Sequence, residues 1–229
     1  MIKVILWDID GTLLDFLKAE HEAIKKCFEI FELGECTDDM IGRYSDINKK
    51  YWERLERGEI TKPEVLIGRF KEFFDLEGIQ TNCAEEFNRE YQIRLGDTIC
   101  FRDNGYELIK SLKGHVKQYA VTNGTKVAQD KKLRLSGLQD LFDGVFISEV
   151  IGYEKPRAEF FHHVWEHIGT YEPSEIMIVG DSLTSDMQGG NNAGIVCCWY
   201  NPGHAENTRG VHVDYEIDDL QKLTTHLHL

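Results

Sequence analysis

Short apolar runs alternate with amphipathic stretches along much of the chain, and this pattern predicts strands and helices in turn. The first apolar run, Ile2–Trp7, is stopped by Asp8 and by the turn-forming pair Gly11-Thr12. Four further runs of strand length lie at 118–122, 145–148, 176–180 and 195–199. Apolar residues recur at helical spacing at about 103–112, 125–135, 157–168 and 185–193. Strict alternation of strand and helix predicts βαβ units and a parallel sheet covered on both faces.

Between about residues 16 and 96 the pattern changes, because apolar residues recur every three or four positions and strand runs are absent. Four amphipathic helices are predicted there, at Ala19–Phe31, Asp46–Arg57, Pro63–Phe74 and Ala84–Leu95. We therefore expect an α/β core made of residues 1–15 and 97–229, with a helical cap of residues 16–96 inserted into it.

Composition narrows the function. The chain has 229 residues, and 26 Lys and Arg against 40 Asp and Glu give a formal charge of −14. This acidic balance argues against nucleic-acid polymers and anionic membranes as partners. The cysteines show no metal-binding spacing, and no leader or membrane span is evident, so a reduced, cytoplasmic enzyme is expected. The pair Cys197-Cys198 lies in an apolar run and is interpreted as part of a buried strand.

Two carboxylates, Asp8 and Asp10, follow the first predicted strand. Ligands of open α/β sheets bind at the carboxyl ends of strands, and a continued period of two places both side chains on one side of the chain. Two carboxylates so close raise the pKa of one unless a cation lies between them. This suits Asp8 as a metal-bound nucleophile and Asp10 as a proton carrier for a leaving oxygen. A solvated turn or a calcium loop is the alternative interpretation.

Three further segments place polar groups at the same edge of the predicted sheet. Asp181 and Asp186 follow the strand 176–180 and could complete a Mg²⁺ site, with Asp186 steering Asp181 or a water. Thr122 and Asn123 precede a helix and could cradle phosphoryl oxygens, and Lys155 could neutralise their charge. Taken singly, Asp181 and Asp186 are equally typical of the start of a helix. Thr122 and Asn123 alone are more typical of an ordinary turn with a cap, and Lys155 alone of a solvated loop lysine.

The motifs Asp8-x-Asp10-Gly-Thr, Thr122-Asn123-Gly, Lys155-Pro and Gly-Asp181-x₄-Asp186, in this order, resemble those of the haloacid dehalogenase (HAD) phosphatase superfamily. The resemblance implies a doubly wound sheet with a helical cap, Asp8 as nucleophile and Asp10 as general acid and base. It also implies that Thr122, Asn123 and Lys155 hold the phosphoryl group. Asp8, Asp181 and the Asp10 carbonyl would bind Mg²⁺, or alternatively Mn²⁺, with Asp186 behind them. Dehalogenases of this superfamily lack a carboxylate at the position of Asp10, so phosphate chemistry is favoured.

Further segments, among them 46–52 and 199–202, resemble the branch that contains pyrimidine 5′-nucleotidases. A pyrimidine nucleoside monophosphate (dUMP, UMP or dTMP) is therefore the expected substrate. The alternatives are another small ester such as phosphoglycolate or a sugar phosphate, a phosphomutase, and a non-catalytic protein that binds metal or phosphate. Tyr44, Trp52, Phe70 and Tyr91 could line a nucleoside recess in the cap, although their helical spacing is more typical of a core.

Overall fold

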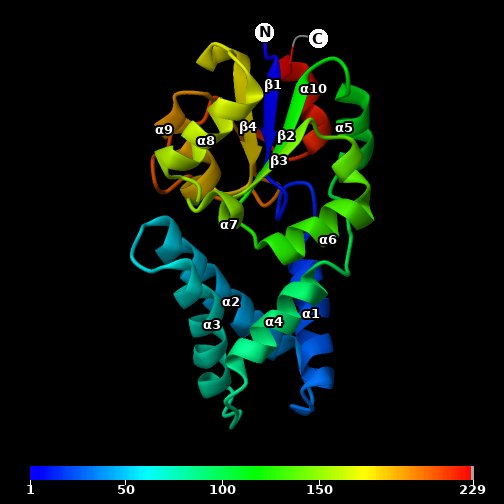
Figure 1. Cartoon of the computed structure of the whole chain (residues 1–229), viewed down its shortest axis with the longest axis vertical. Coiled ribbons are helices and arrows are strands. Elements are labelled where there is room, and N and C mark those ends of the chain that lie inside the picture. Colours follow the sequence, from blue (N-terminus) through cyan, green and yellow to red (C-terminus); the bar gives the residue numbers. More distant parts are fainter. Residues whose placement is uncertain (228–229) are drawn as a thin grey trace.

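A six-stranded sheet forms the centre of one lobe of the molecule in the computed structural model, which describes residues 1–227 (Figure 1). Its strands are β1 (Val4–Trp7), β2 (Lys117–Thr122), β3 (Gly144–Ile147), β4 (Ile176–Gly180), β5 (Val196–Tyr200) and β6 (Tyr215–Ile217). The order is β3-β2-β1-β4-β5-β6, and every neighbouring pair is parallel. The predicted doubly wound parallel sheet is thus confirmed, with β1 inside it and β6 as a strand that the sequence pattern did not predict.

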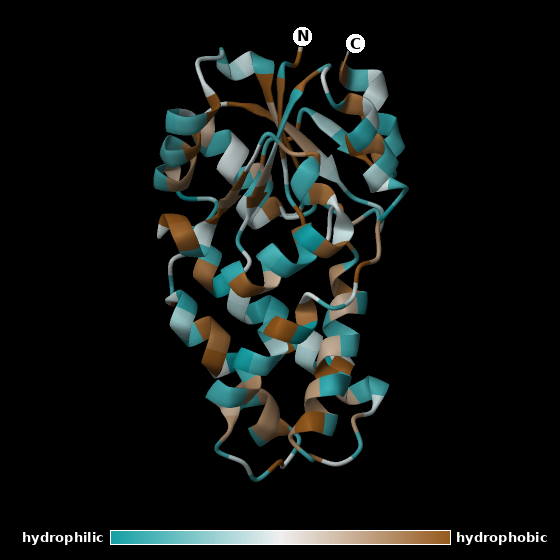
Figure 2. Cartoon of the chain, turned by 45° about the vertical axis from the view of Figure 1, so that its right-hand side comes forward, coloured by the Kyte–Doolittle hydropathy of each residue, from teal (hydrophilic) through white to brown (hydrophobic). Residues whose placement is uncertain are grey.

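Helices cover both faces of this sheet. They are α5 (Gly105–Leu112), α6 (Lys126–Ser136), α7 (Ser148–Ile151), α8 (Ala158–Ile168), α9 (Gln188–Ala193) and α10 (Thr224–Leu227), with short helices η1 (Leu138–Asp140), η2 (Pro173–Glu175), η3 (Leu183–Met187) and η4 (Leu220–Leu223). Alternate side chains of β1 enter two different cores. Ile5 and Trp7 pack with α5 and η4, whereas Val4 and Leu6 pack with α8. Buried strands of this kind are apolar on both faces, and Figure 2 shows hydrophobic residues in brown within strands of the sheet.

Four helices build the second lobe: α1 (Phe16–Ile30), α2 (Asp38–Glu56), α3 (Lys62–Leu76) and α4 (Ala84–Leu95). They share a core of their own, rich in aromatic rings, that includes Tyr44, Phe70 and Tyr91. A separate core is the mark of a domain, and on this ground we propose that residues 16–96 form a cap on an α/β core of residues 1–15 and 97–229.

Local capping explains where the cap helices begin. The Asp15 carboxylate accepts a hydrogen bond from Lys18 N (3.1 Å) and starts α1. Thr61 and Glu64 form a capping box at the start of α3, and Pro63 lies in its first turn as predicted. Helix α2 begins at Asp38 rather than at Asp46, because the Thr37 hydroxyl caps Met40 N (3.3 Å).

Two smaller expectations also have an outcome. Cys197 and Cys198 are both buried in β5, so their interpretation as strand residues is confirmed. Among the described residues, no helix is both long enough and apolar enough to cross a membrane.

Candidate active site

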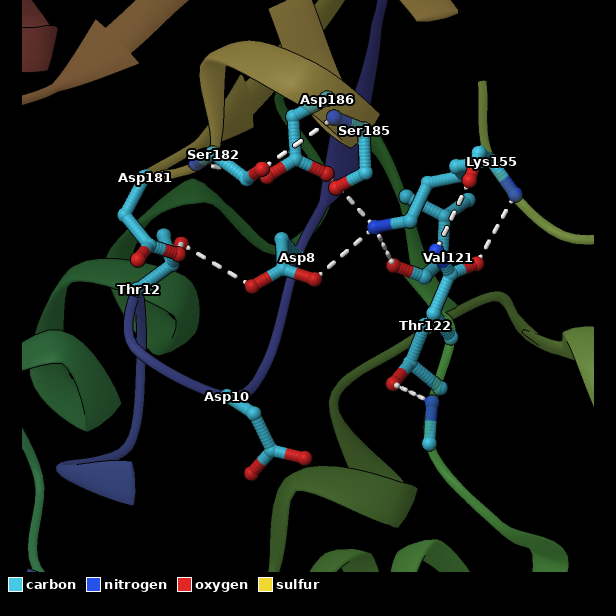
Figure 3. Close-up of polar contacts among 12 residues, drawn as sticks. Asp8, Asp10, Thr12, Val121, Thr122, Lys155, Asp181, Ser182, Ser185 and Asp186 are labelled. Atoms are coloured by element: carbon cyan, nitrogen blue, oxygen red, sulfur yellow. Dashed lines mark hydrogen bonds and ion pairs between the residues drawn. The ribbon is translucent and has the colours of Figure 1, made fainter. Parts of the chain in front are cut away.

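The carboxylate of Asp8 lies just beyond the end of β1 and is held on both sides (Figure 3). Lys155 Nζ donates to Asp8 Oδ1 at 2.8 Å, and the Thr12 hydroxyl donates to Asp8 Oδ2 at 3.1 Å. Asp8 is only 7% exposed, yet it lines a cavity. Its side chain is therefore fixed in orientation while one side stays open to a ligand.

Two more carboxylates complete a cluster around Asp8. Asp8, Asp181 and Asp186 each place a carboxylate oxygen within 4.8 Å of the other two. Close backbone approach makes this possible, because a side chain at Gly11 or Gly180 would collide with Asp181 or Asp186. Gly11 also has φ of +101°, a conformation that favours glycine. Both glycines thus allow the loops after β1 and β4 to bring their carboxylates together.

The cluster is short of positive charge. Burial raises the pKa of Asp8 well above its ordinary value, and Asp186 and Asp181 add to this, while Lys155 acts in the opposite direction. Desolvation also raises the pKa of Asp181 to about 7, and Asp186 is the second cause, although Asp181 is exposed to the cavity. One lysine facing three carboxylates leaves an excess of negative charge, and such a site favours a bound cation.

The Lys155 ammonium group is buried and fully engaged. Its Nζ donates to Asp186 Oδ1 (2.6 Å) and to Val121 O (2.7 Å) besides Asp8, and both carboxylates raise the pKa of this lysine. Asp186 also accepts from Ser182 N at 3.1 Å. In this structure Asp186 therefore positions Lys155 and the loop after Asp181, rather than bonding to Asp181 itself.

Asp10 does not pair with Asp8 as the strand periodicity predicted. The chain leaves the extended conformation after Trp7, so alternation does not continue, and the Asp10 side chain points away from Asp8 (Figure 3). Its carboxylate accepts from Gln129 Nε2 at 2.6 Å and from Lys132 Nζ, both on α6. Asp10 still lines the same cavity. The raised pKa of Asp8 consequently comes from burial, Asp186 and Asp181, not from Asp10.

Thr122 and Asn123 lie at the carboxyl end of β2, and their side chains make different hydrogen bonds. The Thr122 hydroxyl accepts from Gly124 N at 3.0 Å, so its own proton is free to be donated into the cavity. The Asn123 side chain, in contrast, donates to Lys155 O (2.9 Å) and accepts from Lys155 N (2.8 Å). The sequence led us to expect a phosphate contact by the Asn123 side-chain amide. In the structure this amide is bonded to the Lys155 backbone, so a phosphate contact would have to replace one of these two bonds.

A cavity of about 170 Å³ separates these loops from the cap. Its cap wall is formed by Phe16, Trp52, Glu56, Arg69, Gln92 and Leu95. Of the four aromatic residues considered for a nucleoside recess, only Trp52 lines this cavity, whereas Tyr44, Phe70 and Tyr91 are fully buried in the cap core. The core interpretation is thus confirmed for those three.

Several residues at the site were not singled out from the sequence. Thr12 bridges Asp8 and Asp181, because its hydroxyl also lies 3.1 Å from Asp181 Oδ1, and its place in the first motif could have indicated this role. Lys132 and Gln129 hold Asp10, and Glu56 accepts a hydrogen bond from Thr184. These three lie on helices without a distinctive motif, so only their tertiary placement reveals them.

The residues fit a hard divalent cation. Carboxylate and carbonyl oxygens are the ligands that Mg²⁺ prefers, and the clustered, charge-deficient carboxylates supply them. A second group, His163, Glu166 and His167 on α8, also places ligand atoms within 4.8 Å of one another. Glu166 is the third potential ligand that the His163 and His167 spacing alone did not indicate. These side chains are largely exposed and lie outside the cavity, and we assign them no role.

The fold and the site define an α/β protein with an acidic centre at the carboxyl edge of its sheet. Residues 2–194 match the family of haloacid dehalogenase-like hydrolases, and the chain belongs to this family. The predicted family and the prediction of a hydrolytic enzyme are thereby confirmed.

Three relatives resemble the chain over nearly its whole length. It is 36% identical to the putative HAD-hydrolase YfnB of Bacillus subtilis, covering 96% of this chain and 93% of YfnB. It is 35% identical to the pyrimidine 5′-nucleotidase PynA of Streptococcus pneumoniae (96% and 93% covered) and 27% identical to the pyrimidine 5′-nucleotidase YjjG of Escherichia coli (96% and 95%). A crystal structure of YfnB bound to magnesium, described as revealing interdomain movement, superposes with a TM-score of 0.92 at 34% identity, over 100% of this chain and 99% of that one.

Proposed function

We propose that this protein is a Mg²⁺-dependent phosphatase that hydrolyses small phosphate monoesters through a phosphorylated Asp8. The observation that carries the proposal is the Asp8 carboxylate, which Lys155 and Thr12 fix at the wall of the cavity. A nucleophile held in one orientation beside a cation-attracting cluster suits attack on a phosphoryl group, where positioning and charge stabilisation do most of the work.

The chemistry divides into two displacements. In the first, an Asp8 oxygen forms a bond to phosphorus, the bond from phosphorus to the ester oxygen breaks, and Asp10 gives its proton to the leaving oxygen. In the second, water attacks the phosphorus, Asp10 takes a proton from it, and the bond to Asp8 breaks to release phosphate. Because the Asp10 carboxylate now faces α6, it reaches the leaving oxygen by side-chain rotation away from Gln129 and Lys132.

Asp8, Asp181 and the Asp10 carbonyl are the proposed Mg²⁺ ligands. The cation supplies charge neutralisation for the carboxylates and the phosphoryl oxygens. Thr122 donates its hydroxyl proton to a phosphoryl oxygen, and Lys155 balances the charge on Asp8. Asn123 and Asp186 hold Lys155 in place.

The proposed substrate is a pyrimidine nucleoside monophosphate such as dUMP, UMP or dTMP. The names of PynA and YjjG support it, since both cover almost the whole chain. The cavity supports it chemically, because Phe16 and Trp52 offer flat apolar faces. We propose that the protein acts in the cytoplasm, in keeping with a metabolite substrate.

One observation favours a second candidate, a smaller ester such as phosphoglycolate or a sugar phosphate. The cavity of about 170 Å³ is below the roughly 300–1,000 Å³ of ordinary small-molecule sites. A nucleoside would therefore require the cap to move outward, as the movement described for YfnB allows, whereas a small ester would fit without it.

Phosphate release from a panel of esters, measured with Mg²⁺ and with EDTA, tests the proposal. The panel holds dUMP, dTMP, UMP, AMP, phosphoglycolate and glucose phosphates, with Asp8→Asn as the inactive control. Mg²⁺-dependent turnover led by the pyrimidine nucleotides is expected. Faster turnover of a small ester would overturn the proposed substrate and support the proposed reaction. If the folded protein hydrolyses none of these esters, the phosphatase proposal is wrong.

The role of Asp10 has its own test. Asp10→Asn should slow hydrolysis of alkyl esters by about 10²–10⁴-fold, the usual contribution of a general acid or base. The loss should be smaller for p-nitrophenyl phosphate, whose leaving group needs no proton. An equal loss in the first displacement for both ester types, measured in single-turnover experiments, would contradict the acid role.

A further inference from the structure

A buried lysine of the cap, Lys62, reaches across to the loops that hold the phosphate site. Lys62 is the first residue of α3 and is only 9% exposed. Its Nζ lies 2.9 Å from Asn123 O, 3.2 Å from Gly124 O and 2.9 Å from Ser148 Oγ. An ammonium group has three donors, and here all three meet acceptors of the α/β core, none of which is a carboxylate.

The two carbonyl contacts act on the phosphate loop, the segment 122–125 that joins β2 to α6. The C=O of Asn123 and the N–H of Gly124 belong to one planar peptide unit and point in opposite directions. That N–H donates to the Thr122 hydroxyl at 3.0 Å, which leaves the hydroxyl proton as the group available to the cavity. The C=O of Gly124 belongs to the peptide that ends at Thr125, the N-cap of α6. Lys62 thus acts on Thr122 through one peptide unit.

We propose that Lys62 is a positioning residue through which the cap orients and polarises the phosphate-binding loop of the α/β core. The inference rests on the proposed phosphatase function, and it adds a residue that does not touch the reacting atoms. A cation on the two carbonyls strengthens the N–H groups of the same peptides as donors. The phosphate cradle is therefore complete only when the cap lies against the core.

Other cap contacts define what is specific to Lys62. Glu56, at the end of α2, accepts a hydrogen bond from Thr184 in η3, the short helix after β4. Glu56 and Lys62, at the facing ends of α2 and α3, together contact the segments that follow β2, β3 and β4. Within residues 1–227, Lys62 is the one cap residue whose side chain donates to the Asn123 and Gly124 carbonyls, whereas Glu56 contacts η3.

The protonation state of Lys62 offers a readout that a purely structural contact would not. Burial lowers the pKa of Lys62 to about 8, and Glu149 and Glu154 act in the opposite direction. Trp52 lies beside the ammonium group and does not titrate. As pH rises through about 8, the amine keeps two donors for three acceptors and loses its charge. Because burial lowers this pKa, the neutral amine is buried more easily than the ammonium group, and deprotonation does not oppose cap closure. The loss of charge therefore acts on the loop that contains Asn123 and Gly124.

Kinetics with p-nitrophenyl phosphate test the inference, since the leaving group of this ester needs no proton from Asp10 in the first displacement. Lys62→Met should lower kcat by roughly 100-fold, the cost of slight misplacement in an active site. Lys62→Arg keeps a charge at every pH, so the ratio of wild-type to K62R kcat should fall about 10-fold between pH 7 and 9.5. Lys71→Met, at an exposed position of the same helix, is the matched control.

Hydrogen exchange of segment 119–126 supplies a measurement that needs no activity. Exchange there should be faster in K62M than in the wild type and K71M. If the wild type hydrolyses no phosphate ester but K62M still loses protection, the proposed function fails and the loop contact stands. A wild-type kcat in K62M, a kcat ratio independent of pH, or unchanged exchange would each overturn the positioning role.

Discussion

Two buried polar clusters, one in each lobe, differ in their balance of charge. In the α/β core, three carboxylates (Asp8, Asp181 and Asp186) face a single ammonium group, that of Lys155. In the cap, one carboxylate, Glu20, and one guanidinium, Arg69, are joined through the amide of Asn48. Asn48 Nδ2 donates to Glu20 (2.7 Å), and Arg69 Nη1 donates to Asn48 Oδ1 (2.7 Å).

The difference separates a binding site from a structural network. The cap cluster is neutral overall. Asn88 extends it by accepting from Arg69 and Gln92, and Gln92 accepts in turn from the Thr125 hydroxyl of the core. The core cluster carries excess negative charge and is open to the cavity through Asp181. Where buried charges balance, removing one partner destabilises the fold, whereas charges left unbalanced favour a ligand at the expense of stability.

The largest expected effect comes from removing the charge of Asp8. Asp8→Asn should lower kcat by about 10⁴-fold or more, as loss of a nucleophile does. In EDTA the same variant should be as stable as the wild type or more stable, because a buried carboxylate with a raised pKa is gone. Phosphate release and thermal unfolding check both parts. If the variant keeps its activity, or unfolds at a temperature well below that of the wild type, the core cluster does not differ from the cap cluster as proposed.

The cap cluster should respond in the opposite way. Burial raises the pKa of Glu20 too, but Glu20→Gln leaves the Arg69 charge buried with no counter-charge and should cost about 3 kcal/mol of unfolding free energy. In contrast, Lys155 keeps Asp186 when Asp8 is changed. Glu20 does not line the cavity, so kcat per folded molecule should change little. Denaturant unfolding and kcat measured together test this, with exposed Glu22→Gln on the same helix as control. Unchanged stability would show that the cap network does not depend on the charge of Glu20.

The sequence predicted the loops of the core cluster better than the rest of the site, and the reason is local. Each motif follows an apolar run, and the carboxyl ends of parallel strands meet at one edge, so Asp8, Lys155 and Asp181 could be expected together. The direction of Asp10 could not, because it depends on Lys132 and Gln129 of a helix packed from elsewhere in the chain.

The cap contacts were beyond sequence patterns for the same reason. Lys62 looks like an ordinary helix start, and only the packing of the cap on the core gives it three acceptors. Strand β6 escaped prediction because Tyr215–Ile217 is short and flanked by charged residues at an edge of the sheet.

Mg²⁺ should stabilise the protein through the core cluster and not through the cap cluster. Mg²⁺ at about 100 times its dissociation constant should stabilise the fold by about 2.7 kcal/mol and raise Tm by roughly 5 °C or more. Asp181→Asn should remove most of this shift, and Glu20→Gln should leave it intact. Thermal unfolding with Mg²⁺ and with EDTA measures it. An equal shift in wild type and the Asp181 variant would place the metal elsewhere.

The smallest expected effect concerns Glu56, which joins the two lobes. Burial raises its pKa to about 7 from an ordinary 4.5, with Thr184 acting in the opposite direction and Asp186 adding to the rise. The folded protein therefore binds this proton more tightly than the unfolded chain does, and stability falls as pH rises from about 4.5 to 7. Asp8 and Asp181 share this direction, so the wild type must be compared with Glu56→Gln, which stays neutral while its amide oxygen still accepts from Thr184. Relative to that variant, the wild type should lose on the order of 1 kcal/mol of unfolding free energy between pH 5 and 7.5. Parallel curves for the two proteins would mean that the Glu56 charge is as well solvated as in the unfolded chain, and that the contact between lobes carries no electrostatic cost.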